Sequence, residues 1–420
     1  MNVELAYGRH GLHVDVPDDA AVVRPLEVPG LPDEAAAIET ALDRPIDSPP
    51  LCDLVRPSDR VVIVFSDITR PMPSDRALPV LLRALDGVPR ERITLLNGLG
   101  THRVNTPEEL EGMLGRGIAR HYHIAQSDAW DEDDLVDLGE TRYGHRAIVN
   151  RQYLEADVRI LTGFIEPHIF AGFSGGPKAV LPAVAGIDSI MGNHGYAMLN
   201  HPKATWGYTE GNPVWEEMLE VALMTRPSFL LNVTLNRRRQ ITGVYAGDMV
   251  AAHRTGIEAV RRTAMVGVGA ACDVVLTTNS GYPLDINLYQ AVKGMSAAAQ
   301  IVKRGGDIVI AAECRDGVPD YGEYRPLVHE GGSVQGIIDL IAQPGFRCHD
   351  QWEAQVHAQV LQRASVHVHS TYLPDDEVRG MLFEPCHDIE ATVAELLRRH
   401  GPGARLCVLP EGPQTIPHLT

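Results

Sequence analysis

The sequence has no hydrophobic run long enough to span a bilayer, and it lacks the basic and then apolar start of a signal peptide. Its first residues, MNVELAYGRHGLHVDVPDD, are polar and acidic. We therefore expect a cytoplasmic protein with no membrane association. Positive charge is also scarce, with 37 lysines and arginines against 55 aspartates and glutamates and a formal net charge of -18. This balance argues against a nucleic-acid partner, because binding to phosphates requires a surplus of positive charge.

Three common enzyme fingerprints are missing as well. The glycines of GLGTHR (98–103) do not have the spacing of a GxGxxG motif, so a nicotinamide dehydrogenase has weak support. In GFSGGPKA (172–179) a proline separates the last glycine from the lysine, so the segment is not a Walker A loop. No GxSxG sequence occurs, which leaves an α/β-hydrolase unsupported.

The six cysteines form no CxxC pair, which argues against a zinc knuckle or a thioredoxin-like motif. We expect all six to be small buried side chains in a reducing compartment. They are Cys52, Cys272, Cys314, Cys348, Cys386 and Cys407. The pairs HYH (121–123) and HVH (367–369) have the look of metal ligands, but no third ligand is nearby, so we interpret both as structural.

The sequence does contain short apolar runs that alternate with helical segments. The runs are VVIVF (61–65), ITLLN (93–97), VRILT (158–162), DVVLTT (273–278) and DIVIAA (307–312). Such continuous runs are typical of parallel strands that are buried on both faces. Helices are expected at 33–43, 106–114, 213–224, 250–262, 284–303, 333–342, 351–362 and 389–400. The pattern predicts an α/β fold with mostly parallel sheets flanked by helices.

A domain boundary is expected near residues 263–271, where a long amphipathic segment ends and a new strand begins at Asp273. A chain of 420 residues is long enough for two domains with separate cores. We predict an N-terminal α/β domain over residues 1–265 and a C-terminal α/β domain over residues 266–420. The active site is expected in the cleft between them.

Polar side chains follow the predicted strands, and ligands of open α/β sheets bind beyond the carboxyl ends of strands. In the first domain these side chains are Asp67, Arg70, His102, Glu166, His168 and Lys178. In the second domain they are Tyr289, Gln290 and Lys293. Reactive groups from both domains are therefore expected to face one ligand.

These residue types suit a small anionic substrate. Arg70 offers a planar fork of donors that matches a carboxylate. His102 and His168 can exchange protons near neutral pH. The segment AGFSGGPK (171–178) combines glycines, which favour close backbone approach to a phosphate, with a lysine that supplies a charge or an amine nucleophile.

Each of these features also has a structural interpretation. A single histidine after a strand is more often a hydrogen-bonded structural residue, and Asp67 and Arg70 could pair across a turn. SGGP could be only a turn, and residues 289–293 could form the solvated face of a helix. The residues by themselves thus predict a two-domain α/β enzyme for a small anionic ligand and go no further.

Taken together and in order, several segments resemble the lactate racemase family, which uses a nickel-pincer nucleotide. They are AYGRHGLHVDVPDD, SDITRPMPS, GLGTHR, EPHIFAGFSGGPKAVLPAVAG, GNHG, NSGYPLDINLYQAVKG and HDQWEAQ, and they span nearly the whole chain. The resemblance implies an isomerase, a racemase or epimerase that inverts C2 of a 2-hydroxycarboxylic acid such as lactate. Malate, an aromatic lactate or a sugar acid are alternative substrates.

The resemblance also implies roles for individual residues. The cofactor is a nickel-bearing pyridinium-3,5-bisthiocarboxylic acid mononucleotide, which Lys178 can tether through a thioamide and to which His194 contributes the protein ligand of nickel. His102 and His168 match the two proton-transfer histidines. Further cofactor contacts are expected from Asp67, Ser174, Gly175, Gly176, Tyr289, Gln290 and Trp352.

In the implied mechanism, one histidine takes the hydroxyl proton while the α-hydrogen leaves as hydride, and the hydride then returns to the other face. Arg70 and Lys293 would hold the carboxylate and polarise the reacting oxygen. Cofactor-biosynthesis enzymes are implied as partners. Two other classes stay open, a nicotinamide- or metal-dependent oxidoreductase of a small hydroxy acid and a non-catalytic carrier of the nucleotide.

Overall fold

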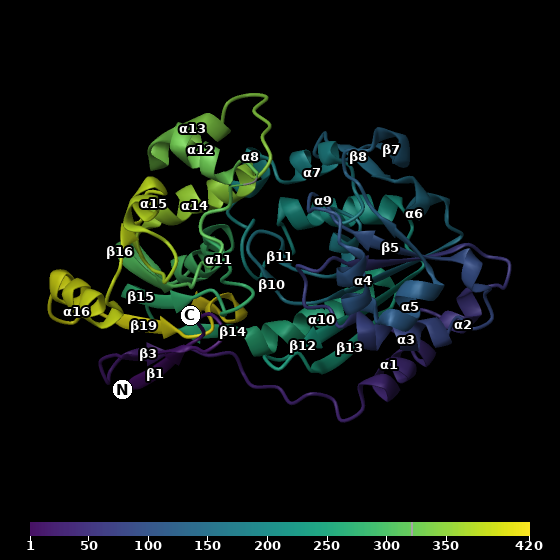
Figure 1. Cartoon of the computed structure of the whole chain (residues 1–420), viewed down its shortest axis with the longest axis horizontal. Helices are drawn as coiled ribbons and strands as arrows, with labels where there is room; N and C mark the ends of the chain where they lie inside the picture. The colour runs from purple at the N-terminus through teal and green to yellow at the C-terminus, as the bar shows by residue number, and fades with distance from the viewer. Residues whose placement is uncertain (321) are drawn as a thin grey trace. The chain divides into compact units, whose positions relative to one another are not determined.

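The computed structural model describes residues 1–320 and 322–420, which divide into two compact units. The unit that we call the central unit consists of Glu27–His194 and Pro202–Arg262. The other, which we call the terminal unit, consists of Met1–Leu26, Gly195–His201 and Thr263–Thr420. Each unit contains a six-stranded sheet with helices packed against it (Figure 1).

The sheet of the central unit has the strand order β13-β12-β9-β4-β5-β6. All neighbouring pairs are parallel except β12–β13, which adds an antiparallel edge. The strands are β4 (Val61–Ser66), β5 (Ile93–Gly98), β6 (His123–Gln126), β9 (Val158–Phe164), β12 (Phe229–Leu235) and β13 (Ile241–Gly247). Both faces of β4, β9 and β12 are buried, which explains why their sequences are nearly continuous apolar runs.

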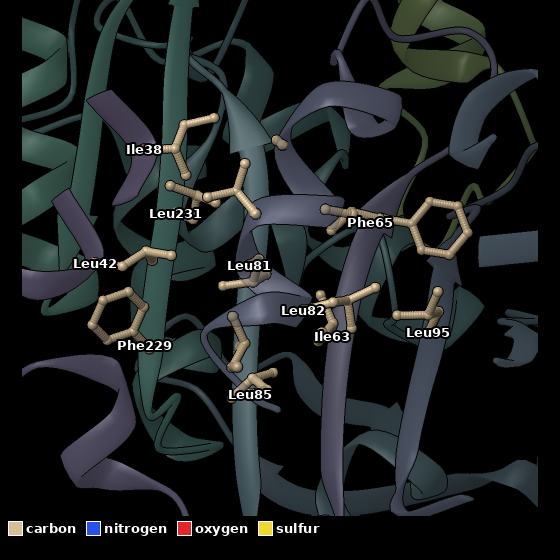
Figure 2. Packing of buried hydrophobic residues seen from close by; sticks show 14 of the residues in the cluster. Ile38, Leu42, Ile63, Phe65, Leu81, Leu82, Leu85, Leu95, Phe229 and Leu231 are labelled. Atoms are coloured by element: carbon tan, nitrogen blue, oxygen red, sulfur yellow. The ribbon is translucent and has the colours of Figure 1, made fainter. Parts of the chain in front are cut away.

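Helices close the core on one face of this sheet. Ile38 and Leu42 of α1 and Leu81 of α3 are gathered with Leu231 and Ile63 of the strands (Figure 2). The helices of the unit are α1 (Glu34–Asp43), α2 (Leu51–Leu54), α3 (Ser74–Arg83), α4 (Pro107–Leu114), α5 (Arg116–His121), α6 (Arg151–Glu155), α7 (Ile187–Asn193), α9 (Pro213–Met224) and α10 (Met249–Ala264). The unit also contains two small antiparallel strand pairs. They are β7 (Leu135–Glu140) with β8 (Arg146–Asn150) and β10 (Pro167–His168) with β11 (Gly172–Phe173).

The sheet of the terminal unit has the order β18-β17-β16-β15-β19-β3, and all its pairs are parallel. Its strands are β3 (Ala21–Val22), β15 (Cys272–Thr278), β16 (Val302–Ala311), β17 (Ala364–His369), β18 (Glu384–Pro385) and β19 (Leu406–Leu409). The helices are α8 (Tyr196–Leu199), α11 (Leu288–Ala299), α12 (Tyr324–Gly331), α13 (Val334–Ile341), α14 (Gln351–Arg363), α15 (Asp375–Gly380) and α16 (Ile389–His400). β14 (Met265–Val268) pairs with β20 (Ile416–Leu419) beside them.

The first residues of the chain are part of the terminal unit. β1 (Asn2–Leu5) and β2 (Leu12–Asp15) form a hairpin whose apolar side chains, Val3, Leu5 and Val14, pack in one core cluster with Val274 and Val408. β3 then extends the sheet by pairing with β19. The two units therefore differ from the continuous 1–265 and 266–420 domains expected from the sequence. The last boundary falls at 262/263, but residues 1–26 and 195–201 also belong to the terminal unit. The N-terminal hairpin buries its apolar face in the core of that unit, and the Tyr196 carbonyl accepts a hydrogen bond from Gln355 of α14 at 3.2 Å.

The fold class expected from the sequence is confirmed, and every apolar run named above lies in a strand except for Ala312, which follows the end of β16. The segment 284–303 is helical only over α11, because the Asn287 side chain accepts the Gln290 N–H and caps the helix there. The expectation for the cysteines was too broad, since Cys52 is exposed and Cys348 is half-buried. Among the described residues, no helix has the length and apolar character needed to cross a bilayer.

Candidate active site

Asp67 and His102 meet at the carboxyl ends of β4 and β5. The Asp67 carboxylate is 3% exposed, and its Oδ2 forms a short hydrogen bond with Nδ1 of His102. Its Oδ1 accepts the N–H (3.0 Å) and the hydroxyl (2.7 Å) of Thr69. Burial alone would raise the pKa of Asp67, but the hydrogen bonds from His102 and Thr69 and the charge of Arg70 lower it below its usual value. An ionised Asp67 keeps the proton on Nδ1 of His102, so Nε2 has the lone pair of a general base.

Arg70 does not simply pair with Asp67, which was one alternative for this segment. The carboxylate takes its hydrogen bonds from His102 and Thr69, and Arg70 acts on it through charge. The Arg70 backbone N–H closes the turn on the Asp67 carbonyl at 3.2 Å. The half-buried Arg70 thus lies in the loop after β4 that also carries Asp67, and its role in binding a carboxylate stays a prediction.

A second group of side chains surrounds Phe170, in the hairpin of β10 and β11 that follows β9. The rings of His168 and His194 lie edge-on to the Phe170 ring, with centroids 4.7 and 5.0 Å away. The Lys178 ammonium is 5.8 Å from the same ring centroid. One aromatic ring therefore brings together a predicted acid–base histidine, the predicted nickel ligand and the predicted cofactor anchor. Sequence reasoning did not single out Phe170.

The two histidines of this second group have different surroundings. His194 is 5% exposed, and burial together with the neighbouring Lys178 charge lowers its pKa to about 3. It is therefore a neutral imidazole, which is the metal-binding form. Nδ1 of His168 accepts the backbone N–H of Ala171 (3.2 Å) and of Phe170 (3.5 Å), so a neutral His168 carries its proton on Nε2.

Hydrogen bonds connect the loop of His102 with the segment of Lys178. The carbonyl of Ala183 accepts the N–H of Gly100 at 2.9 Å and the hydroxyl of Ser127 at 3.0 Å. The Ala183 N–H in turn donates to the Lys178 carbonyl at 3.3 Å. The Asp67–His102 pair and the group around Phe170 thus share one edge of the central sheet, as the strand-end argument predicted.

The glycines of SGGPK have a packing role in the structure. A Cβ on Gly176 would come within 2.3 Å of the His253 ring, and one on Gly175 within 2.6 Å of Asn232 Oδ1. The Gly176 N–H already donates to Asn232 at 2.8 Å. The Ser174 hydroxyl donates to the Phe164 carbonyl at 3.0 Å. These contacts favour the turn interpretation of this segment, and cofactor binding by residues 174–176 stays a prediction.

In the terminal unit, Tyr289 and Trp352 form a network with Asp350. The indole N–H of Trp352 donates to the Tyr289 hydroxyl (3.1 Å), which donates to Asp350 Oδ1 (3.2 Å). Burial and nearby carboxylates raise the pKa of Tyr289 well above its usual value, so it remains a donor. On the same helix, α11, the Lys293 ammonium donates to Gln290 Oε1 at 2.7 Å. Since Tyr289, Gln290 and Lys293 are half-buried and hydrogen-bonded, they are not merely a solvated helix face.

Sequence reasoning missed two carboxylates of this network, although both stand in the quoted segment HDQWEAQ. Asp350 precedes α14, and Glu353 lies on it at 2% exposure. Burial raises the pKa of Glu353 to about 8, with the Lys293 charge opposing the rise and Asp350 adding to it. The available signal was an unusual helix sequence, in which charged and amide side chains alternate with apolar ones throughout the buried α14.

The two histidine pairs in the sequence have structural partners. His121 ends α5 with Nδ1 2.7 Å from the Gly117 carbonyl. Nε2 of His367 is 3.0 Å from Asp307 Oδ1, and Asp307 also receives hydrogen bonds from Arg399 (2.6 Å) and His400 (2.7 Å). These contacts fit the structural role that we expected for HYH and HVH.

Comparison with known proteins identifies the family. The family model of the lactate racemase N-terminal domain matches residues 7–207, and that of the lactate racemase C-terminal domain matches residues 268–416. The chain is 38% identical over 385 residues to a lactate racemase of Lactiplantibacillus plantarum, with 90% of each chain covered. It is 34% identical to a lactate racemase of Thermoanaerobacterium thermosaccharolyticum, with 99% of each chain covered.

A solved structure agrees with these sequence matches. The lactate racemase apoprotein from Thermoanaerobacterium thermosaccharolyticum superposes with a TM-score of 0.92 at 32% identity, covering 99% of this chain and 100% of the other. The resemblance read from the motifs, and the racemase-type isomerase that it implied, are confirmed: the chain belongs to the lactate racemase family.

Proposed function

We propose that this protein racemises or epimerises a 2-hydroxycarboxylic acid, with lactate as the first candidate, and that its cofactor is a nickel-pincer nucleotide. The observation that carries the proposal is the grouping of His168, His194 and Lys178 around Phe170 in a chain of the lactate racemase family. The relatives named above support lactate over malate, aromatic lactates and sugar acids.

The residues fit such a cofactor. His194 offers a buried neutral imidazole, and the Lys178 amine lies 5.8 Å from the centroid of the same Phe170 ring. Across residues 1–320 and 322–420, no three His, Cys, Asp or Glu side chains are grouped to hold a metal ion. One imidazole without further protein ligands suits a nickel ion whose remaining ligands, soft sulfur among them, belong to the nucleotide. Lys178 would tether that nucleotide.

The two histidines are proposed to exchange protons with the substrate, one as acceptor and the other as donor. When bound, the nucleotide supplies an acceptor for the α-hydrogen as hydride. Nε2 of His102, whose Nδ1 is hydrogen-bonded to Asp67, would take the hydroxyl proton. A protonated His168 would be the donor that returns a proton to the substrate oxygen on the opposite side. His102 then loses its proton to water and His168 regains one, which balances the turnover.

Charged groups would hold the substrate and complete the assignment. Arg70 and Lys293 are proposed to bind the carboxylate, because a guanidinium and an ammonium stabilise both the bound anion and the oxygen that changes charge. Tyr289, Gln290 and Trp352 are proposed as cofactor contacts. Cofactor-making enzymes remain predicted partners, and the cytoplasm remains the predicted location.

The test is to co-express the protein with cofactor-making enzymes and measure its intact mass and nickel content, then incubate it with L-lactate and separate the enantiomers. We expect a mass adduct of the nucleotide, nickel close to one per chain and a racemic product. His194→Ala should lose nickel while circular dichroism stays unchanged. His102→Ala should keep nickel and lose racemisation.

Three results would overturn the proposal. Stoichiometric nickel in His194→Ala would remove the metal assignment. Protein without adduct or nickel that oxidises a hydroxy acid with added NAD would identify the oxidoreductase alternative, and loaded protein that turns over none of the four acid classes would identify the carrier.

A further inference from the structure

A buried carboxylate lies beneath the segment that carries His194, and neither the sequence motifs nor the mechanism uses it. Glu217, on α9, is 1% exposed. It accepts hydrogen bonds from the Thr141 hydroxyl (2.6 Å), from Nδ1 of His145 (2.9 Å) and from the Asn193 amide (3.0 Å). Burying a charge is costly unless hydrogen bonds replace its water, and three donors achieve this here.

The three donors come from separate parts of the central unit. Thr141 and His145 flank the turn between β7 and β8, and Asn193 is the last residue of α7. Glu217 therefore ties the β7–β8 turn and the end of α7 to α9. One buried carboxylate therefore connects α7, α9 and the β7–β8 turn by hydrogen bonds.

The hydrogen bonds of Glu217 extend to Asn193, the residue directly before His194. Asn193 precedes it directly, is fully buried, and donates from the same amide nitrogen to the Val214 carbonyl at 3.0 Å. The His194 N–H donates to Ile190 at 2.9 Å and so closes the last turn of α7. A Cβ on Gly192 would come within 2.7 Å of the His145 ring, so that ring packs against the same turn. Hydrogen bonds and packing thus fix the main chain just before the imidazole.

We propose that Glu217 is a positioning residue for His194, acting through Asn193 and His145. This inference rests on the proposed function, because the metal-binding role of His194 is part of it. Metal–ligand distances tolerate only a few tenths of an ångström, so a shift of the α7 end reduces affinity for nickel. Loss of an outer partner of a metal ligand typically costs about 10–100-fold in metal affinity.

The experiment compares Glu217→Ala with Tyr153→Phe, after co-expression with the cofactor-making enzymes. Tyr153→Phe removes another buried hydrogen bond in the same unit, from the Tyr153 hydroxyl to Thr225 at 3.1 Å, without touching α7. Nickel release into a chelator is timed for each protein. We expect Glu217→Ala to release nickel about 10–100-fold faster than the parent, and Tyr153→Phe to release it at the parental rate. Glu217→Gln, which still accepts from Asn193, should fall close to the parent.

A second readout uses the apoprotein and does not depend on the cofactor. Hydrogen exchange of the segment 187–200, followed by mass spectrometry, should accelerate in Glu217→Ala and not in Tyr153→Phe. Unchanged exchange there, or equal nickel release from both variants, would overturn the proposal. A parent that takes up no nickel would count against the proposed function instead, and the exchange result would still decide the role of Glu217.

Discussion

Replacing Glu353 by glutamine should make the terminal unit more stable at neutral and alkaline pH. Glu353 is 2% exposed, and its Oε1 has no hydrogen-bond partner among the residues that the structure describes. Burial raises its pKa from 4.5 to about 8, although the Lys293 charge opposes this, and Asp350 raises it further. The native state therefore keeps a proton that the unfolded chain releases above pH 4.5.

The sign and size of the effect follow from this difference. Between the two pKa values the native state holds one proton more than the unfolded state, so its stability falls as pH rises, by ~1.4 kcal/mol per pH unit. The loss amounts to about 3 kcal/mol between pH 5 and pH 8. Glutamine is neutral at every pH, so Glu353→Gln removes this loss. The variant and the parent should differ least near pH 5 and most above pH 8.

Fluorine NMR of protein labelled with 5-fluorotryptophan can follow this unit by itself. Of the four tryptophans, Trp352 belongs to the terminal unit, and Trp130, Trp206 and Trp215 belong to the central unit. Urea unfolding of the Trp352 signal is measured from pH 5 to pH 9 for parent and variant. The matched control is Glu395→Gln, which neutralises an exposed carboxylate on α16 of the same unit and should leave the pH slope unchanged. Parallel pH curves for the parent and Glu353→Gln would refute the argument.

Three further predictions concern other contacts. Asp307→Asn should have the opposite pH effect, because two histidines and an arginine lower the pKa of Asp307 despite its burial. The stabilisation by the Asp307 carboxylate is therefore present above pH 4 and is lost as pH falls. If the urea midpoints of parent and variant fall equally below pH 4, this argument is wrong. Asp67→Asn should slow racemisation about 10²–10⁴-fold with nickel retained, because the base His102 loses its tautomer control, and a parental rate in a chiral assay would exclude this. Gly176→Ala should cost about 1–3 kcal/mol in thermal unfolding, since φ is +52° and the new Cβ meets the ring of His253, whereas an unshifted melting curve would show that the loop can adapt.

The sheets and the location of the polar side chains could be predicted from the sequence because buried parallel strands produce apolar runs that end at polar loops. Thus the runs at 61–65 and 93–97 located β4 and β5, and the residues after them located Asp67 and His102. Their short hydrogen bond could not be predicted, because it depends on how two loops from adjacent strands curve toward each other. The resemblance supplied the roles of Lys178 and His194, which residue types alone left open.

Other features depend on contacts that have no local signal. Phe170 lies at the centre of its group because the hairpin after β9 brings it close to Lys178 and His194. The buried partners of Glu217 lie 24 to 76 residues away in the chain, so no spacing rule connects them. The N-terminal hairpin looked like part of the first domain because sequence neighbours usually fold together, but its apolar face matched the core of the terminal unit.

The composition of the terminal unit from both ends of the chain affects the order in which the protein can fold during synthesis. Residues 1–26 leave the ribosome before β15, β16 and β19, the strands on which their apolar side chains pack, because these strands follow residue 262. The strands and helices of the central unit are synthesised before β15, β16 and β19, so the central unit can fold before the N-terminal hairpin has strands to pack on. Trimming the N-terminus should therefore disturb the sheet beside Tyr289 and Trp352, at the opposite end of the sequence, and spare the sheet that positions His102.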